Sequence, residues 1–282
     1  MDSAGSLPGF QARPLESAAV APDPAAGLGR MRNRQADHPF RLPAIRLGSL
    51  VALILLSYGG LRAVGVETGF PPLQPFTLIL LTVISGWAVR RELLSAGCAA
   101  TTYLGACRDR LWRDLAQGVG WLMVTYAVMI VPLIGMMLLL FGGEALSRFE
   151  TVFAPSAVAL TPAASRVLGA ASLVAALLFV LNAPIEEAIF RGWLQAGLSR
   201  RWGPAPAIVV QALVFGAQHT LLAYNLRGGL VMGVAFFFWG LAAGWIVHWQ
   251  GRLMPVVIAH WIANLLTGVI PQIAVGMILL GG

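Results

Sequence analysis

The chain has 282 residues, of which 58% are hydrophobic and 11% are charged, and its formal net charge is +7. A soluble domain carries about 25% charged residues, so this composition excludes an ordinary soluble globular protein. The apolar stretches are continuous blocks and not alternating ten-residue strands, which excludes a transmembrane β-barrel. We therefore predict an all-α polytopic membrane protein. All the basic residues are arginine. They cluster in the segments that connect the apolar blocks, where they orient helices, so we predict no nucleic-acid partner.

The N-terminal segment, residues 1–43, is rich in Ala, Pro and Gly. It contains no apolar region close to its start of the kind found in a signal peptide. We predict that it forms a disordered tail on the cytoplasmic side of the membrane. A basic stretch from Arg30 to Arg46 begins within this segment, and its arginines can also contact anionic lipid headgroups.

The rest of the chain, residues 44–282, is predicted to form a helical membrane domain of seven to eight transmembrane helices. The fourth apolar block is too long for one upright span and contains Pro184, which predicts a tilt, a kink or a break before Glu186. The last block contains Gly268 and Pro271 and suits one span followed by a short interfacial helix. The apolar blocks cover residues 45–61, 74–90, 118–141, 167–199, 205–223, 229–248 and 253–281.

The distribution of arginine predicts the orientation of these helices. If the N-terminus lies inside, fourteen arginines fall on internal segments and only four, Arg62, Arg148, Arg166 and Arg227, fall outside. This asymmetry predicts a cytoplasmic N-terminus. An arginine-only composition rich in Ala, Gly and Pro suggests a bacterium with GC-rich DNA, so we predict the bacterial inner membrane. Cys98 and Cys107 then lie in a cytoplasmic segment, where we expect reduced thiols.

Two adjacent carboxylates stand out, because Glu186 and Glu187 are the only acidic residues after Glu150. A charge at membrane depth costs roughly 2.5–3.5 kcal/mol on insertion scales, so the pair needs partners or a function. Glu187 and Arg191 are four residues apart on one helical face, and we predict that they pair. Glu186 is then left without an arginine and can act as a general base or acid. A structural ion network is the alternative interpretation.

Two histidines also lie within apolar blocks, His219 in FGAQH and His260 in HWIAN. A single buried histidine is usually a packing residue, but these two accompany a surplus carboxylate and the amide of Asn264. The set suits attack of water on a carbonyl group. We predict that Glu186 and His219 position and deprotonate the water. His260 and Asn264 would donate hydrogen bonds to the oxyanion, at about 2.7–4 kcal/mol per donor. No serine or cysteine is clearly placed for a covalent route.

The motifs EEAIFR, FGAQH and HWIAN, in this order, resemble the three signatures of the CPBP intramembrane proteases, also called the CAAX amino-terminal protease or Abi family. The family pattern is Glu-Glu-x-x-x-Arg, Phe-x-x-x-His and His-x-x-x-Asn, and this chain meets every position. The family includes the eukaryotic CAAX prenyl endopeptidase, which removes the last three residues of farnesylated proteins. The resemblance implies a protease core at about residues 165–282, with its site in a cavity open to the cytoplasmic side.

The resemblance also implies a role for each motif residue. It assigns Glu186 and His219 to water activation, His260 and Asn264 to the oxyanion, and a supporting role to Glu187 and Arg191. Zinc is possible as a cofactor, because the family is often labelled metalloprotease and one carboxylate with two imidazoles can bind zinc. No cofactor is favoured, however, because the chain lacks the His-Glu-x-x-His pair that presents two ligands on one helical face.

The expected partners are the lipid bilayer and a membrane protein or peptide that serves as substrate, including proteins with a C-terminal membrane anchor. We do not expect CAAX processing, since most bacteria do not prenylate their own proteins. The rival interpretation is a non-enzymatic protein, either a proton-coupled transporter or a scaffold, that uses the same buried polar cluster. Transporters usually show internal repeats, and none is visible here. For a protease, we expect Glu186→Ala to abolish hydrolysis without unfolding the bundle.

Overall fold

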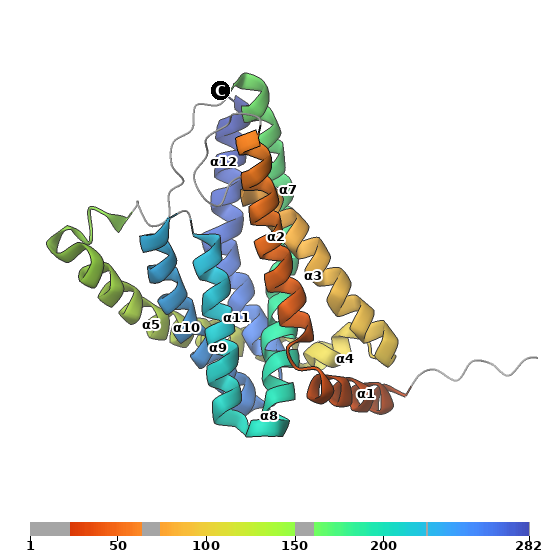
Figure 1. The fold of residues 1–282 in the computed structure, drawn as a ribbon. Helices are drawn as coiled ribbons and strands as arrows, with labels where there is room; N and C mark the ends of the chain where they lie inside the picture. The colour runs from red at the N-terminus through yellow and green to blue at the C-terminus, as the bar shows by residue number, and fades with distance from the viewer. Residues whose placement is uncertain (1–22, 64–73, 150–160, 224, 282) are drawn as a thin grey trace, which may run out of the picture.

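The structure is a computed structural model that describes residues 23–63, 74–149, 161–223 and 225–281. Over these residues the chain forms a bundle of helices and no strand, which confirms the all-α prediction (Figure 1). The helices of the first half are α1 (Pro24–Asp37), α2 (Arg41–Ala63), α3 (Gln74–Ala96), α4 (Ala100–Leu104) and α5 (Leu111–Phe141). Those of the second half are α7 (Pro162–Glu187), α8 (Ala196–Trp202), α9 (Pro204–Leu222), α10 (Leu226–Gln250), α11 (Met254–Asn264) and α12 (Ile270–Gly281).

Six of the described helical segments are long and apolar enough to cross a membrane. The predicted number of seven to eight is not confirmed. Helix α3 has the length of a span, but it carries Arg90, Arg91 and Glu92 near its C-terminal end and is not among the six. The six segments are Arg41–Ala63, Ala100–Glu144, Pro162–Trp202, Pro204–Leu222, Leu226–Gln250 and Met254–Gly281.

The two irregular apolar blocks are continuous helical segments, so of the tilt, kink or break predicted before Glu186 only the break is wrong. Helix α7 continues through Pro184 to Glu187 without a break, and a π-helix, η3 (Ala188–Gln195), joins it to α8. In the last block, a second π-helix, η4 (Leu265–Val269), joins α11 and α12 into one continuous helical segment. A separate interfacial helix does not form. Both irregularities follow motif residues directly, and π-turns within α-helices frequently occur at functional sites.

Helix α1 corrects the prediction of a disordered tail for the part of residues 1–43 that is described. The Asp23 side chain caps the helix by accepting a hydrogen bond from the backbone N–H of Ala25 at 2.9 Å. Met31 and Gln35 are buried, because α1 packs across the end of the bundle beside α8 (Figure 1). The composition of residues 1–43 does not predict this helix, because contacts with the rest of the bundle stabilise it. Residues 1–22 lie outside the described residues.

The contact between α1 and α8 depends on Gly197. A Cβ atom on this residue would lie 2.2 Å from the backbone oxygen of Gln35, which cannot move without displacing α1. We therefore expect Gly197→Ala to destabilise the protein by about 1–3 kcal/mol, as overpacking does elsewhere. Thermal unfolding in detergent would show this as a lower melting temperature.

The matched control is Gly135→Ala in α5, where the added Cβ meets no atom within 4 Å. Alanine is the better helix former by about 0.8–1 kcal/mol, so this variant should melt at or above the wild-type temperature. A Gly197→Ala protein as stable as Gly135→Ala would contradict the close packing of α1 on α8.

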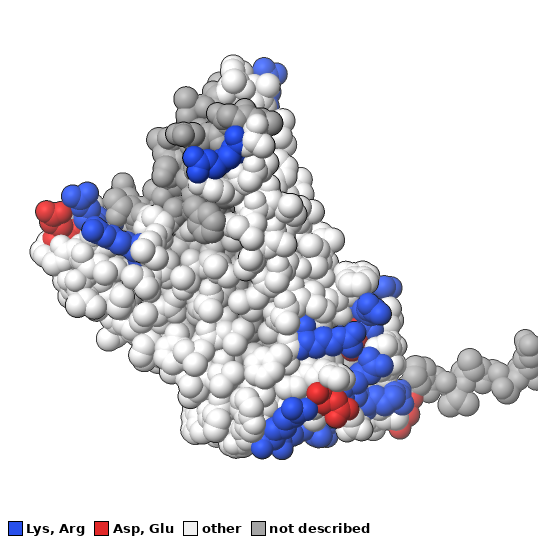
Figure 2. All heavy atoms as spheres, viewed as in Figure 1, with Lys and Arg blue, Asp and Glu red and all other residues white. Residues whose placement is uncertain are grey.

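Charged side chains gather at the end of the bundle that carries α1, and a smaller group lies toward the opposite end (Figure 2). The surface between them is almost free of charge in this view. The membrane-capable helices carry exposed apolar side chains, among them Leu55, Leu56 and Leu177. Such a band matches the apolar belt that a hydrocarbon core requires. The cytoplasmic location of the N-terminus and the bacterial inner membrane remain predictions.

The two cysteines are free thiols, as the sequence predicted. Cys98 is buried directly after α3, whereas Cys107 is exposed. Burial raises the pKa of the Cys98 thiol, and the nearby Arg30 guanidinium partly opposes that shift. A thiol with a raised pKa is a weaker nucleophile at neutral pH, which agrees with a structural role for Cys98.

Candidate active site

The two adjacent glutamates end helix α7 deep within the bundle. Glu186 and Glu187 are 2% and 0% exposed, and every residue of the π-helix η3 that follows them is buried. Their carboxylates therefore depend on protein groups for solvation, because an isolated charge in an apolar interior is strongly unfavourable. The surrounding helices supply these groups.

Glu187 is held by an arginine and a histidine at the same oxygen atom. Its Oε1 accepts a hydrogen bond from Arg191 Nη1 at 3.0 Å and lies 2.8 Å from His260 Nδ1. The Arg191 guanidinium also lies over the Phe215 ring, 4.3 Å from its centre. The predicted pair of Glu187 and Arg191 is confirmed, and α11 joins it through His260.

Glu186 also has an arginine partner, which corrects the prediction that it is unpaired. Its Oε1 accepts hydrogen bonds from Arg46 Nη2 of α2 and, at 2.8 Å, from Gln218 Nε2 of α9. Arg46 is 1% exposed and lies within a membrane-capable helix, whereas the charge pattern of the sequence predicts a loop arginine at this position. The sequence did not predict this contact because Arg46 and Glu186 are 140 residues apart in the chain.

The other polar partners of Arg46 were not predicted either. Its Nε donates to Gln218 Oε1 at 2.5 Å, its Nη1 to Ser85 Oγ at 3.0 Å and its Nη2 to Asn182 Oδ1 at 3.0 Å. Two of these residues had a signal in the sequence, since Asn182 lies one turn before Glu186 and Gln218 belongs to the FGAQH motif. Nothing in the sequence of α3 marked Ser85.

His260 lies between the two glutamates. Because a carboxylate only accepts hydrogen bonds, the nitrogen facing Glu187, Nδ1, carries a proton in this contact. The other ring nitrogen, Nε2, lies 3.5 Å from Oε2 of Glu186. That Oε2 is buried and has no hydrogen-bond partner among the described residues. On Glu186 it is therefore the oxygen that remains able to accept a further hydrogen bond. Oε2 of Glu187 is likewise buried without a hydrogen-bond partner among the described residues.

His219 is fixed by one hydrogen bond and one stacking contact. Its Nδ1 lies 2.8 Å from the backbone oxygen of Phe215, and a carbonyl only accepts, so Nδ1 carries the proton. In the neutral ring, Nε2 is then the acceptor. The imidazole stacks on Phe236 with ring centres 3.6 Å apart. Phe215 also packs against His260, at 6.2 Å between ring centres, so it connects the two histidines.

Asn264 is one turn after His260 on α11, directly before the π-helix η4. It is 9% exposed, and its Nδ2 has no hydrogen-bond partner within the described part of the chain. The structure thus links Glu186, Glu187, Arg191 and His260 by direct contacts and brings His219 to them through Phe215. Asn264 is placed by its helical position relative to His260.

Zinc as a possible cofactor stays a prediction. Within the described segments, no group of three or more His, Cys, Asp or Glu side chains is placed to hold a metal ion. Oε1 of Glu186 and Oε1 of Glu187 each bind an arginine, which a metal ion would have to displace to reach those oxygens.

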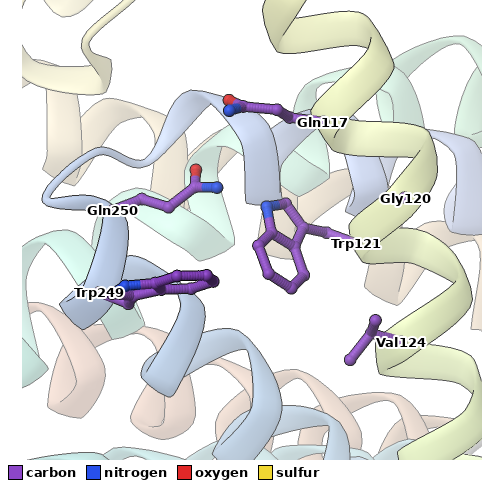
Figure 3. Close-up of a pocket in the computed structure, with 6 residues that line it drawn as sticks. All are labelled: Gln117, Gly120, Trp121, Val124, Trp249 and Gln250. Atoms are coloured by element: carbon purple, nitrogen blue, oxygen red, sulfur yellow. The ribbon is translucent and has the colours of Figure 1, made fainter.

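Two grooves on the surface lie apart from these residues. One, of about 520 Å³, runs between α5 and the end of α10, and its lining includes Trp121, Trp249 and Gln250 (Figure 3). The other, of about 550 Å³, shares Trp121 and Trp249 and is mostly apolar. Neither groove is lined by any of the six predicted site residues. The cavity open to the cytoplasmic side that the resemblance implies remains a prediction.

The fold and the buried cluster together define an all-helical protein whose membrane-capable helices enclose two glutamates, two histidines and two arginines. Residues 168–266 match the model of the type II CAAX prenyl endopeptidase Rce1-like family. This segment includes all six predicted site residues, and the match confirms the family resemblance of the three motifs. It supports a CAAX-type intramembrane protease in general. Comparisons with curated proteins and with solved structures found no match.

Proposed function

We propose that the protein is an intramembrane endopeptidase that hydrolyses a peptide bond of a membrane-associated or C-terminally anchored protein or peptide. The observation that carries this proposal is the position of Glu186. One of its oxygens is fixed by Arg46 and Gln218, and the other lies 3.5 Å from His260 Nε2 without a hydrogen-bond partner in the described part of the chain. A carboxylate held in this way suits proton transfer.

The first step is attack of water on the scissile carbonyl carbon. Oε2 of Glu186 accepts a proton from the water while the oxygen of the water bonds to the carbon. Nε2 of His219 is the acceptor nitrogen of that ring when neutral, so it orients the same water through a second hydrogen bond. General-base catalysis of this kind contributes about 10²–10⁴-fold to a rate.

The developing oxyanion is stabilised by His260 and Asn264. Asn264 Nδ2 is a donor without a hydrogen-bond partner in the described segments, and it lies one turn from His260. His260 can donate through Nε2 only when both ring nitrogens carry protons, because Nδ1 already faces Glu187. The Glu187 carboxylate balances the positive charge of that ring. Collapse of the tetrahedral intermediate then breaks the scissile C–N bond, and Glu186 transfers the proton that it took from the water to the amine leaving group.

A membrane-bound substrate fits the position of this cluster. The six predicted site residues lie on helices α7, α9 and α11 and, for Arg191, on the π-helix η3. The segments that contain these elements are apolar enough to span a bilayer. A peptide segment already within the membrane reaches such helices without leaving the apolar phase. A non-enzymatic transporter or scaffold would contain the same buried cluster but would leave the termini of membrane proteins unchanged.

The test compares the termini of membrane proteins in a host strain that lacks the gene. The strain is complemented with the wild type or with Glu186→Gln at matched expression. We expect wild type, and not Glu186→Gln, to restore one or more cleaved termini. Identical termini in both strains would contradict the proposal and favour a transporter or a scaffold.

Metal dependence is tested on the same membranes. If cleavage uses only the side chains described here, incubation with EDTA or 1,10-phenanthroline should leave the cleaved fraction unchanged. A loss of cleavage that added zinc restores would replace the proton-transfer scheme by a metal-dependent one.

A further inference from the structure

The segment that matches the protease family does not contain every group that holds Glu186. The carboxylate contacts Arg46, which lies on α2, outside residues 168–266. α3 contributes Ser85 to the same network. The helices that precede the matched segment therefore reach into the candidate active site, and their part in it is not implied by the three motifs.

The guanidinium of Arg46 has one defined orientation. Each of its three nitrogens donates to a side chain on a different element, at Ser85 of α3, Asn182 of α7 and Gln218 of α9, and Nη2 donates in addition to Glu186. A planar group with directed N–H donors that is bound at every nitrogen cannot rotate without losing hydrogen bonds. Arg46 is thereby a fixed donor to Oε1 of Glu186.

A fixed donor at Oε1 determines where the other oxygen points. A carboxylate can rotate about its last single bond, and the hydrogen bonds from Arg46 and Gln218 to Oε1 oppose that rotation. Oε2 is then directed toward His260 Nε2, at 3.5 Å. Small displacements of a catalytic group can cost about 10²-fold in rate, so this orientation is of direct importance for hydrolysis.

We propose that Arg46 is a positioning residue of the catalytic carboxylate, supplied to the protease core by α2. It directs Oε2 of Glu186 toward the water and balances the buried negative charge. This inference rests on the proposed endopeptidase function. Further contacts join the N-terminal elements to the glutamate-bearing segment at the π-helix η3, where Tyr103 donates to the backbone oxygen of Ala188 at 3.2 Å and Trp193 donates to that of His38 at 3.0 Å.

Replacing Arg46 by lysine distinguishes the two effects proposed for this residue, which are the balance of the Glu186 charge and the orientation of the Glu186 carboxylate. An ammonium group at position 46 can balance the charge of Glu186, but it is a compact point charge without the planar fork of arginine. Its three N–H donors cannot reproduce the four hydrogen bonds that Arg46 makes to Gln218, Ser85, Asn182 and Glu186. Arg46→Lys should therefore keep much of the stability of the folded protein but no longer orient the Glu186 carboxylate. Arg46→Met should lose both the stability and the orientation.

The experiment measures kcat, KM and the melting temperature for wild type, Arg46→Lys and Arg46→Met. The probe is a synthetic peptide that spans a cleavage site found in the comparison of membrane-protein termini. Arg41→Lys is the matched control, because Arg41 is the first residue of α2 and forms an ion pair with Glu92 at 2.9 Å, away from the cluster. We expect Arg46→Lys to lower kcat at least about tenfold with KM within about twofold. Arg41→Lys should leave both unchanged.

Three results would overturn the inference. If Arg46→Lys, normalised to its folded fraction, keeps the wild-type kcat, then orientation of the Glu186 carboxylate by arginine is not needed. A loss of activity equal to the loss of folded protein would show a structural role only. Absence of Glu186-dependent termini in the host would remove the proposed function, and the inference with it.

The ion pair between Arg46 and Glu186 can be tested by melting temperature, without a substrate. The double variant Arg46→Met/Glu186→Gln should melt above Arg46→Met, because it no longer buries a carboxylate without its arginine. Equal melting temperatures would contradict the ion pair. This measurement distinguishes a failure of the contact from a failure of the protease function.

Discussion

Replacing Glu186 by glutamine is expected to lower the rate of peptide cleavage per folded protein by about 10²–10⁴-fold, the usual contribution of a general base. The amide has the shape of the carboxylate and keeps an acceptor oxygen for Arg46 and Gln218. It cannot accept the proton of the attacking water at the position of Oε2. The measurement is the initial rate on the substrate peptide with purified protein in detergent, normalised to the folded fraction.

Glu186→Ala is the informative companion variant. From the sequence alone, Glu186→Ala is expected to leave the bundle intact, because no structural partner is predicted for Glu186. The structure pairs Glu186 with Arg46, so alanine would leave a buried guanidinium without its carboxylate. Such a loss costs about 3–5 kcal/mol. We expect Glu186→Ala to melt well below Glu186→Gln. A near-wild-type cleavage rate in Glu186→Gln would exclude Glu186 as the base.

The sequence could predict those parts of the site whose geometry is local. Glu187 and Arg191 are one turn apart, so a helix alone brings them together, and their pair is present. Two histidines within apolar blocks were recognisable as unusual, and His260 does contact Glu187. The order of the three motifs was sufficient to predict the family resemblance that the match over residues 168–266 confirms. The Glu187–Arg191 pair can be predicted because the two residues are close in sequence. The histidines and the motifs can be recognised without knowing which residues they contact.

The sequence could not predict contacts between distant segments. Arg46 lies near the start of an apolar block, after a basic stretch, where a loop arginine and a buried arginine look the same. Its partner is 140 residues away, and no spacing rule covers that separation. Helix α1 was missed for the same reason, because Met31 and Gln35 become buried only through tertiary packing.

The π-helices show a different limit. A sequence with Pro184 before the glutamates predicts a disturbance at the proline. The observed disturbance lies after Glu187, where η3 changes the helical period over eight fully buried residues. All eight residues of η3 are buried, and nothing in their sequence marked the change from an α-helix to a π-helix. The carboxylates therefore sit at the boundary between an α-helix and a π-helix, and Arg191 reaches Glu187 from within the π-helix.

Arg191→Met is expected to produce a large loss of stability although Glu186 and its partner Arg46 stay intact. Both side chains of the Glu187–Arg191 pair are 0% exposed, so the variant leaves a buried carboxylate without its arginine. It also removes the guanidinium from the Phe215 ring. Loss of one partner of a buried pair costs about 3–5 kcal/mol. The measurement is the melting temperature in detergent, together with the denaturant midpoint where unfolding is reversible.

The matched control for this variant is Arg148→Met. Arg148 and Glu144 are also four residues apart, with an N–O distance of 3.0 Å, but their side chains are 54% and 67% exposed. An exposed pair of this kind contributes about 0.3–0.5 kcal/mol, so the control should melt close to wild type. The double variant Arg191→Met/Glu187→Gln should recover part of the loss, since it removes the unpaired charge. Equal effects of Arg191→Met and Arg148→Met would mean that Glu187 finds another cation or water, and that the buried pair does not stabilise the site.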